Sequence, residues 1–133
     1  MQQLPIKGST PAESWLNVSQ TSRQGVYVCD FQERHLGNPL IRSIHGGTVG
    51  MLIEYCAEQE LKHHLAQKGV EARVELTSSS VDYLRVTKDA PLYGRAEVVR
   101  IGRRIGFIDT WCWQDSEDLP VSRGTCRLRI FES

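Results

Sequence analysis

The residues best suited to chemistry stand together at His45, Gly46 and Gly47, directly before an apolar stretch that carries one carboxylate, Glu54. Glycine is a poor helix former, costing about 1 kcal/mol against alanine in a helix interior, so two glycines at a helix start require a reason. One reason is close packing against a strand. The other is that unshielded N–H groups at the positive end of a helix could stabilise negative charge on a carbonyl oxygen. The motif alone leaves both reasons open.

Glu54 is the acid most suited to act with this helix start, because the residues around it, from Met51 to Ala57, are nearly all apolar. The alternative is a carboxylate on the polar face of the helix, beside Glu58. The helical rise and turn put Glu54 roughly 13 Å from His45 along the axis, on the opposite side of the helix. A single site that uses both residues would therefore need two copies of the chain related by a two-fold axis. This predicts an obligate dimer.

The histidines and cysteines offer fewer possibilities. His45 could act as a base or could hold the loop by hydrogen bonds, and we favour the second role because His45 has no partner in its own chain. His35, His63 and His64 are expected at the surface, and no ligand spacing accompanies them, so no metal site is predicted. Four cysteines stand far apart without a C-x-x-C pair and are expected to be buried free thiols: Cys29, Cys56, Cys112 and Cys126.

The elements that must position these residues follow from the periodicity of the sequence. Apolar residues recur at intervals of three and four from Gly46 to Lys68, which predicts one long helix. A capping motif before it predicts a short helix over 11–19. β-branched, aromatic and alternating residues predict strands over 24–31, 71–86, 91–101, 105–114 and 120–131, the last four as an antiparallel meander. Together they predict an α+β fold in which the sheet wraps the long helix.

Length and composition limit the class of protein. The chain has 133 residues, which suits a single domain over 1–133 with a real core. Sixteen Lys and Arg residues balance sixteen Asp and Glu residues, so no net field favours nucleic acid or an anionic membrane as a partner. No window approaches the roughly 20 apolar residues of a membrane-spanning helix, and the N-terminus lacks the apolar core of a signal peptide. We therefore expect a soluble, cytoplasmic protein.

Three segments together resemble a known family. They are the stretch from Asn38 to Gly47 (NPLIRSIHGG) with an acid nine positions after its histidine, the segment 81–85 (VDYLR), and the segment 98–103 (VVRIGR). Over residues 24–131 the chain resembles the PaaI-like, phenylacetate-pathway type of hotdog-fold acyl-CoA thioesterase. The resemblance implies a five- to six-stranded antiparallel sheet around the helix and a homodimer that often pairs into a homotetramer. It also implies hydrolysis of a small or medium acyl-CoA thioester without metal or cofactor.

The resemblance implies roles at the helix start and in the loop before it. The Gly46 N–H, with Gly47 close by, would bind the thioester carbonyl, and Glu54 would act as general base or as nucleophile. Asn38 would orient water or the carbonyl. It departs from the family pattern, because it stands seven residues before His45 where many members have six.

The resemblance also implies substrate-binding residues on the strands. Some members place a hydroxyl on the strand that faces the acid, but Leu76 stands at its usual position here, so Thr77 or Ser78 would have to replace it. Guanidinium groups bind phosphates by paired hydrogen bonds. The candidates to contact the phosphates of coenzyme A are Arg85, Arg103 and Arg104.

Two other classes of function stay open. One is a hydratase or dehydratase on the same fold. Hydratases of the MaoC type carry an acid and a histidine where this chain has Leu36 and Ile41, while carrier-protein dehydratases pair a loop histidine with a helix acid but generally lack the HGG start. The other class is a protein that binds acyl-CoA without turning it over. The sequence does not name the acyl group, nor choose between CoA and acyl-carrier protein or between dimer and tetramer.

Overall fold

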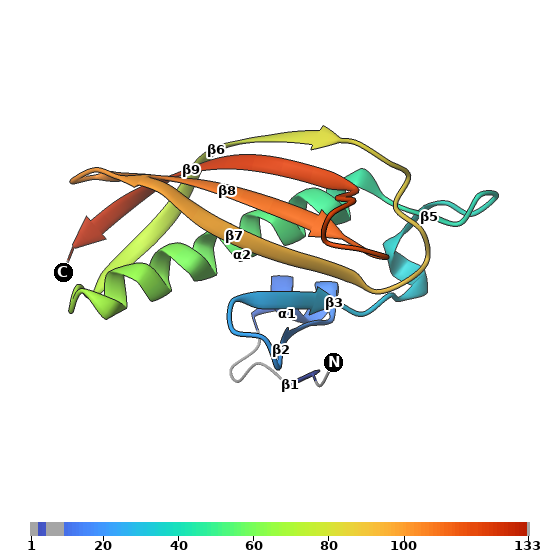
Figure 1. Ribbon diagram of the computed structural model, residues 1–133, viewed down its shortest axis with the longest axis horizontal. Helices are drawn as coiled ribbons and strands as arrows, with labels where there is room; N and C mark the ends of the chain where they lie inside the picture. Colours follow the sequence, from blue (N-terminus) through green and yellow to red (C-terminus); the bar gives the residue numbers. More distant parts are fainter. Residues whose placement is uncertain (1–2, 5–9, 133) are drawn as a thin grey trace.

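One long helix packs against one face of a curved antiparallel sheet (Figure 1). Short N-terminal elements lie beside this helix. The structure is a computed structural model that describes residues 3–4 and 10–132. The helices are α1 (Pro11–Leu16) and α2 (Gly46–Gln67), with a 3-10 turn, η1 (Glu33–His35). The strands are β1 (Gln3–Leu4), β2 (Val18–Thr21), β3 (Val26–Cys29), β4 (Leu36–Asn38), β5 (Ser43–Ile44), β6 (Ala72–Tyr83), β7 (Leu92–Ile101), β8 (Ile105–Trp113) and β9 (Ser122–Glu132). The α+β hotdog arrangement predicted from the sequence is confirmed.

The strands of the main sheet follow the order β1-β2-β3-β7-β8-β9-β6, and all neighbours are antiparallel. These seven strands of the described residues exceed the expected five to six because the two-residue β1 pairs with β2 at one edge. The predicted meander is present in β7, β8 and β9. The prediction is wrong for β6, which pairs with β9 at the other edge, because the second edge of β7 is taken by β3.

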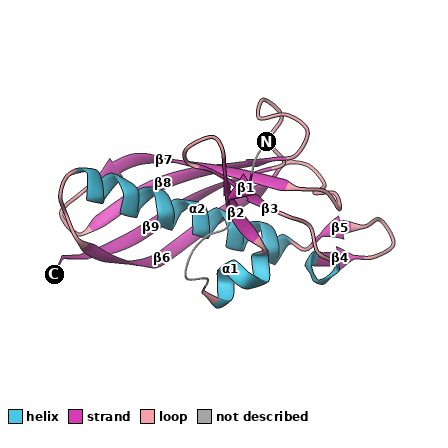
Figure 2. Ribbon diagram, turned by 90° about the horizontal axis from the view of Figure 1, so that it is seen from below, coloured by secondary structure: helices cyan, strands magenta, loops and turns pink. Residues whose placement is uncertain are grey.

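Glycines in the strands let α2 lie close to the sheet. A Cβ at Gly124 of β9 would come within 2.4 Å of the Ile53 Cγ2, and a Cβ at Gly94 of β7 would come within 2.8 Å of the Cys56 Sγ. Figure 2 shows α2 lying across the long strands. All four cysteines are free and buried, as predicted. The buried side of α2 repeats at helical spacing and includes Val49, Leu52, Ile53, Cys56, Ala57, Leu61 and Leu65.

The first helix, α1, is shorter than the predicted helix over 11–19. It has the predicted capping box, in which the Thr10 Oγ1 accepts the Glu13 N–H and the Glu13 carboxylate accepts the Thr10 N–H. Asn17 then takes a left-handed conformation with φ 55° and ends the helix, so the next residues pair as β2 with β3. The second Glu13 oxygen accepts the buried Tyr55 O–H at 2.7 Å, which fastens α1 to the middle of α2.

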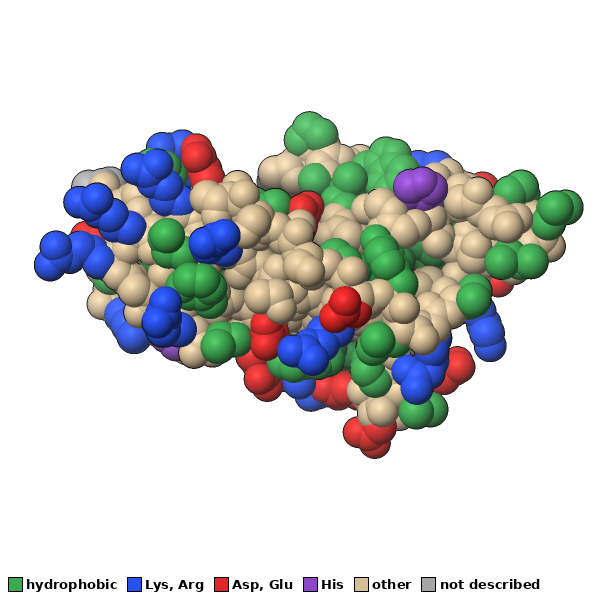
Figure 3. All heavy atoms as spheres, turned by 90° about the horizontal axis from the view of Figure 1, so that it is seen from above, with side chains coloured by type: hydrophobic (Ala, Val, Ile, Leu, Met, Phe, Trp, Pro, Cys, Tyr) green, Lys and Arg blue, Asp and Glu red, His purple; other side chains and the backbone are tan. Residues whose placement is uncertain are grey.

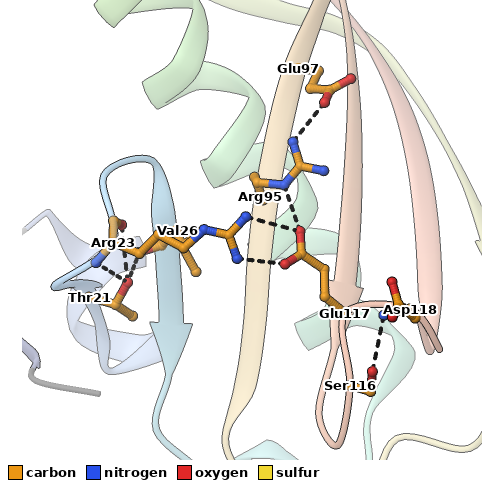
Figure 4. Close-up of polar contacts among 8 residues, drawn as sticks. All are labelled: Thr21, Arg23, Val26, Arg95, Glu97, Ser116, Glu117 and Asp118. Atoms are coloured by element: carbon orange, nitrogen blue, oxygen red, sulfur yellow. Dashed lines mark hydrogen bonds and ion pairs between the residues drawn. The ribbon is translucent and has the colours of Figure 1, made fainter.

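An ion-pair network joins three parts of the sheet (Figure 4). Glu117, in the link between β8 and β9, binds Arg23 of the β2–β3 turn at 2.5 Å and Arg95 of β7 at 2.9 Å, and Arg95 also binds Glu97. Hydrogen bonds from Arg23 and then Arg95 lower the pKa of Glu117. The network holds the link that leads to Val121, whose carbonyl accepts two N–H groups just after β6.

Candidate active site

The start of α2 is anchored by three neighbouring segments. The strand β5 leads into it, and the Ile44 N–H donates to the Thr87 carbonyl at 2.8 Å. The His45 N–H donates to the His35 carbonyl of the η1 turn, also at 2.8 Å. Tyr83, at the end of β6, reaches the helix start from the sheet. The motif singled out in the sequence therefore lies where the β6–β7 link, the η1 turn and β6 meet.

His35 is fully buried, so the prediction that it lies at the surface is wrong. Its Nε2 lies 2.8 Å from the Trp15 carbonyl oxygen, and its Nδ1 accepts the Gln32 N–H at 3.1 Å. These contacts specify the tautomer with the proton on Nε2. The Cys29 Sγ also lies 4.0 Å from the His35 Nδ1. The burial was not predictable from the sequence, because both close hydrogen-bond partners of the ring are backbone groups. His63 is exposed as predicted, whereas His64 is half-buried.

Gly47 makes room for the ring of His45. A Cβ at position 47 would come within 2.9 Å of the His45 Nδ1, and the Gly47 N–H donates to that nitrogen at 2.8 Å. His45 is the N-cap of α2, and its carbonyl accepts the N–H groups of Thr48 and Val49 at 2.9 and 3.3 Å. The ring thus holds the helix start by a hydrogen bond to the backbone. The same bond occupies the Gly47 N–H, which is not free to bind a carbonyl.

Gly46 makes room for a tyrosine. A Cβ at position 46 would come within 3.2 Å of the Tyr83 hydroxyl oxygen, and this O–H donates to the Gly46 carbonyl at 2.9 Å. The Gly46 N–H has no acceptor in the described part of the chain. As the first N–H of α2 it has no intrahelical partner either, so it is open to an incoming oxygen. Close packing against a strand, one of the two reasons considered for the glycines, holds for Gly46, whereas Gly47 receives the ring of the N-cap His45. The role of the Gly46 N–H in binding a carbonyl oxygen stays a prediction.

Glu54 lies half-buried on α2 and accepts a hydrogen bond from β6. The Ser79 Oγ donates to the Glu54 Oε1 at 3.1 Å. The sequence pointed instead to Thr77 or Ser78, but the Thr77 hydroxyl donates to the Arg127 carbonyl and the Ser78 hydroxyl accepts from the Arg127 guanidinium. A β-bulge in this part of β6 reverses which side chains face α2, and strict alternation along the sequence does not reveal it.

Glu54 and the Gly46 N–H do not meet within one chain. They stand eight positions apart on α2, which is about 12 Å along the helix. Glu54 lines a cavity of about 390 Å³ beside α1, together with Glu13 and Tyr55. Gly46 lines a different cavity, of about 520 Å³, beside the end of β6. A reaction that uses both groups has to combine them from two chains.

The cavity at the helix start is mainly apolar and opens on a surface rich in exposed apolar side chains. Among the described residues that line it, Arg85 carries the charge, and its guanidinium donates to the Pro120 carbonyl. The apolar residues around it, most of them exposed, are Ile41, Ile44, Val49, Tyr83, Leu84 and Val86. Contiguous exposed apolar surface of this kind is typical of a binding or subunit interface.

Among the other predicted site residues, Arg103 and Arg104 lie far from the helix start, whereas Asn38 lies near it on β4 but does not line the cavity at Gly46. Arg103 and Arg104 form the β7–β8 turn at the far end of the sheet and line a cavity of about 320 Å³ with Arg129. Figure 3 shows Lys and Arg side chains gathered at that end. Asn38 lies exposed on β4, and its Oδ1 accepts the Leu40 N–H at 3.0 Å. Of the three arginines predicted to bind phosphate, all of them in the described residues, Arg85 alone lines the cavity at Gly46.

Cys126 lies close enough to Glu54 to be affected by its charge. Burial raises the pKa of the Cys126 thiol to about 11, and the carboxylates of Glu54 and Asp109 add to the effect. The thiol therefore stays protonated at neutral pH and does not compete with Glu54 as a nucleophile. No group of three or more His, Cys, Asp or Glu side chains in residues 10–132 is arranged to hold a metal ion. None of the helices that the structure describes combines the length and apolar character needed to cross a membrane.

Comparison with known proteins decides the family. Residues 36–128 match the family described as acyl-CoA thioesterase N-terminal domain. This chain belongs to the acyl-CoA thioesterase family. The match covers both glycines of the helix start, Glu54 and the whole of β6. No curated protein sequence gives a significant match to this acyl-CoA thioesterase family member.

Solved structures share the fold of this family member. A thioesterase from Haemophilus influenzae is 17% identical, with a TM-score of 0.80 over 93% of this chain and 85% of that one. A Bacillus halodurans protein solved with CoA is 16% identical, with a TM-score of 0.77 over 92% and 77%. A phenylacetic acid degradation-related protein from Ralstonia eutropha is 20% identical, with a TM-score of 0.74 over 92% of both chains. At these identities the likeness shows the hotdog fold.

Proposed function

We propose that this chain is a homo-oligomeric acyl-CoA thioesterase whose active site combines Gly46 of one protomer with Glu54 and Ser79 of another. The observation that carries this proposal is a free Gly46 N–H at the start of a long helix, in a chain whose helix also holds a carboxylate with a hydroxyl partner. Membership of the acyl-CoA thioesterase family supports the reaction class. The HGG and VDYLR motifs support the PaaI-like type, and we expect a cytoplasmic enzyme that takes a small or medium acyl group.

The Gly46 N–H would bind the thioester oxygen. It stands at the positive end of a 22-residue helix, where the dipole and the open N–H both favour negative charge. When a nucleophile adds to the thioester carbon, the carbonyl oxygen becomes negatively charged and its hydrogen bond to Gly46 strengthens. Such a donor stabilises the transition state more than the ground state, and loss of one donor typically costs about 10²- to 10³-fold in kcat.

Glu54 would activate water. Ser79 binds one carboxylate oxygen, which fixes the group, and no hydrogen bond to the other oxygen is present in the described part of the chain. A proton passes from water to this carboxylate as the water oxygen bonds to the carbonyl carbon. The C–S bond then breaks, and the CoA thiolate leaves with the proton that Glu54 returns. Direct attack by Glu54 through an anhydride would use the same contacts.

The outer strand β6 offers the surface for a second protomer. It is 12 residues long, and its second edge is unpaired among the described residues. Residues 75–80 are all exposed. Long exposed edges invite strand pairing, and an antiparallel pair of β6 strands around a two-fold axis would close both edges. This pairing would bring Glu54 of each protomer towards the Gly46 end of the other.

The same two-fold operation would complete a site for coenzyme A. It carries the arginine-rich end of one protomer, with Arg103 and Arg104, towards the helix-start end of the other, where Arg85 lines the cavity. Guanidinium groups bind phosphates by charged, often bidentate hydrogen bonds. A structural neighbour solved with CoA supports this substrate class.

Release of free thiol from a panel of acyl-CoAs by the wild type and by Glu54→Gln tests the function. The wild type should release thiol, and Glu54→Gln should lose at least about 100-fold in kcat because it cannot accept the proton. Glu60→Gln, on the same helix but facing a different cavity, is the matched control. Unchanged release by Glu54→Gln would remove its role. Binding of acyl-CoA without release of thiol would indicate a binding protein. A change in the acyl group with the thioester bond intact would indicate a hydratase or dehydratase.

Gly46→Pro tests the oxyanion donor separately. Proline is favoured at the first helical position and removes the N–H while it adds the pyrrolidine ring. His45 has φ −60° and ψ 135°, a conformation suited to the residue before proline. Gly46→Ala adds a Cβ at the same place but keeps the N–H, so it is the matched control. The kcat of Gly46→Pro should be about 10²- to 10³-fold below that of the wild type. The kcat of Gly46→Ala should be at least about ten-fold above that of Gly46→Pro. Equal activity of the two variants would contradict the assignment.

A further inference from the structure

Two peptide planes meet at Gly46, and both are held in place. The first plane joins His45 to Gly46 and carries the free N–H, and its carbonyl accepts two N–H groups of the first helical turn. The second plane joins Gly46 to Gly47, and side chains bind both of its ends. The Tyr83 O–H donates to its carbonyl at 2.9 Å, and its N–H donates to the His45 Nδ1 at 2.8 Å.

Glycine needs such restraint more than any other residue. Without a Cβ, rotation between its two peptide planes is little restricted, so a glycine N–H at a helix start can point in several directions. An oxyanion donor is effective only when it is already aimed at the place where charge develops. The hydrogen bonds of the first plane and the side-chain contacts of the second plane together limit that rotation and hold the direction of the Gly46 N–H.

We propose that Tyr83 is a positioning residue, which aims the Gly46 N–H at the thioester oxygen by holding the Gly46 carbonyl. This inference rests on the proposed role of Gly46. The backbone that carries the phenol is fixed by the sheet, because Tyr83 pairs with Ser122 of β9 and the N–H groups of the next two residues bind the Val121 carbonyl at 2.8 and 3.0 Å. Its ring also lies against the α-carbon of Gly46, where a Cβ would meet the ring carbon Cζ at 3.3 Å.

Two other roles for Tyr83 make different predictions. The ring lines the cavity at the helix start and is 57% exposed, so its hydroxyl could instead bind substrate. Loss of such a contact would raise KM and leave kcat unchanged. A purely structural contact would lower the melting temperature and leave both kinetic constants unchanged. Positioning of an oxyanion donor lowers kcat with little effect on KM.

Tyr83→Phe keeps the ring on Gly46 and removes only the hydroxyl. We expect kcat for acyl-CoA hydrolysis to fall roughly 5- to 30-fold, the scale of one hydrogen bond, with KM within about two-fold of the wild type. Tyr93→Phe is the matched control, because Tyr93 of β7 stacks on Trp113 and does not line the cavity at Gly46. Its kinetic constants should equal those of the wild type. A raised KM at unchanged kcat, or no kinetic change, overturns the inference.

A double-mutant cycle separates this inference from the proposed function. In the Gly46→Pro background there is no N–H to aim, so adding Tyr83→Phe should lower kcat by less than about two-fold. A full 5- to 30-fold further loss would show that Tyr83 acts elsewhere. If Gly46→Pro itself keeps the wild-type kcat, the proposed function of Gly46 fails. If Gly46→Pro loses activity while Tyr83→Phe does not, the positioning role of Tyr83 alone fails.

Discussion

Ser79 and Tyr83 lie four residues apart on β6, and each donates a hydrogen bond to a different part of α2. The Ser79 hydroxyl binds the Glu54 carboxylate at 3.1 Å, and the Tyr83 hydroxyl binds the Gly46 carbonyl at 2.9 Å. Residues four apart on a strand point to the same face and lie about 13 Å from each other. The strand β6 therefore sets the positions of both the acid and the helix start.

Ser79→Ala should impair catalysis because it removes the hydrogen bond that orients Glu54. We expect kcat for thiol release to fall roughly 5- to 30-fold, with the protein still folded. Ser80→Ala, the neighbouring residue whose side chain points to the other face, should behave as the wild type. Equal kcat for the two variants would show that Ser79 does not orient the acid.

His45→Ala and His45→Asn distinguish a capping role from a base. Asparagine is a good N-cap and can accept a hydrogen bond from the start of the helix, whereas alanine cannot. His45→Asn should therefore retain most of the wild-type kcat. His45→Ala should lower kcat roughly ten-fold and lower the free energy of unfolding by about 1 kcal/mol. Comparable, near-complete inactivation of both variants would indicate that the imidazole takes part in proton transfer.

Acid should weaken the network around Glu117. Its pKa is lowered in the folded protein, first by Arg23, so the network stabilises the fold above the ordinary value of 4.5 and loses this effect as the pH falls through the lower folded value. Glu117→Gln should lower the free energy of unfolding at pH 7 by at most about 1 kcal/mol, since the ion pairs are partly exposed. The difference from the wild type should vanish in strong acid. Thermal unfolding at both pH values measures it, and an equal loss at both would contradict the ion-pair explanation.

Gly124→Ala should destabilise the protein because its Cβ would overlap the Ile53 side chain, at 2.4 Å. Overpacking of this kind costs about 1 to 3 kcal/mol, which urea unfolding would detect as a lower midpoint. Gly102→Ala, in the β7–β8 turn with its nearest contact at 3.4 Å, is the control. A variant as stable as the wild type would mean that α2 can move away from β9 at little cost.

The sequence predicts the fold well where a single periodicity decides it. The apolar repeat of α2 and the alternation of the long strands depend on local spacing alone, which the sequence shows directly. The helix and the strands that they predict are confirmed. The resemblance to hotdog thioesterases pointed to Gly46 and Glu54, and the acyl-CoA thioesterase family is confirmed. The position of β6 was not predictable, because it depends on which strand occupies each edge of its neighbours.

The details of the site depend on features that have no local signal. A β-bulge in β6 decides that Ser79, rather than Thr77 or Ser78, faces Glu54. His35 is buried by backbone partners that lie up to 20 residues away in the sequence. The Tyr83 contact joins two segments 37 residues apart. Each of these contacts becomes visible only when the strands and the helix are placed together in space.

Subunit complementation tests the shared active site most directly. Glu54→Gln and Gly46→Pro protomers, each inactive alone, are mixed by co-expression or joint refolding and assayed for thiol release from acyl-CoA. Random pairing makes half of the dimers mixed, each with one intact site and one doubly defective site, so about a quarter of the wild-type activity should return. A mixture that stays as inactive as its parents, although mixed dimers have formed, would contradict a site built from two chains.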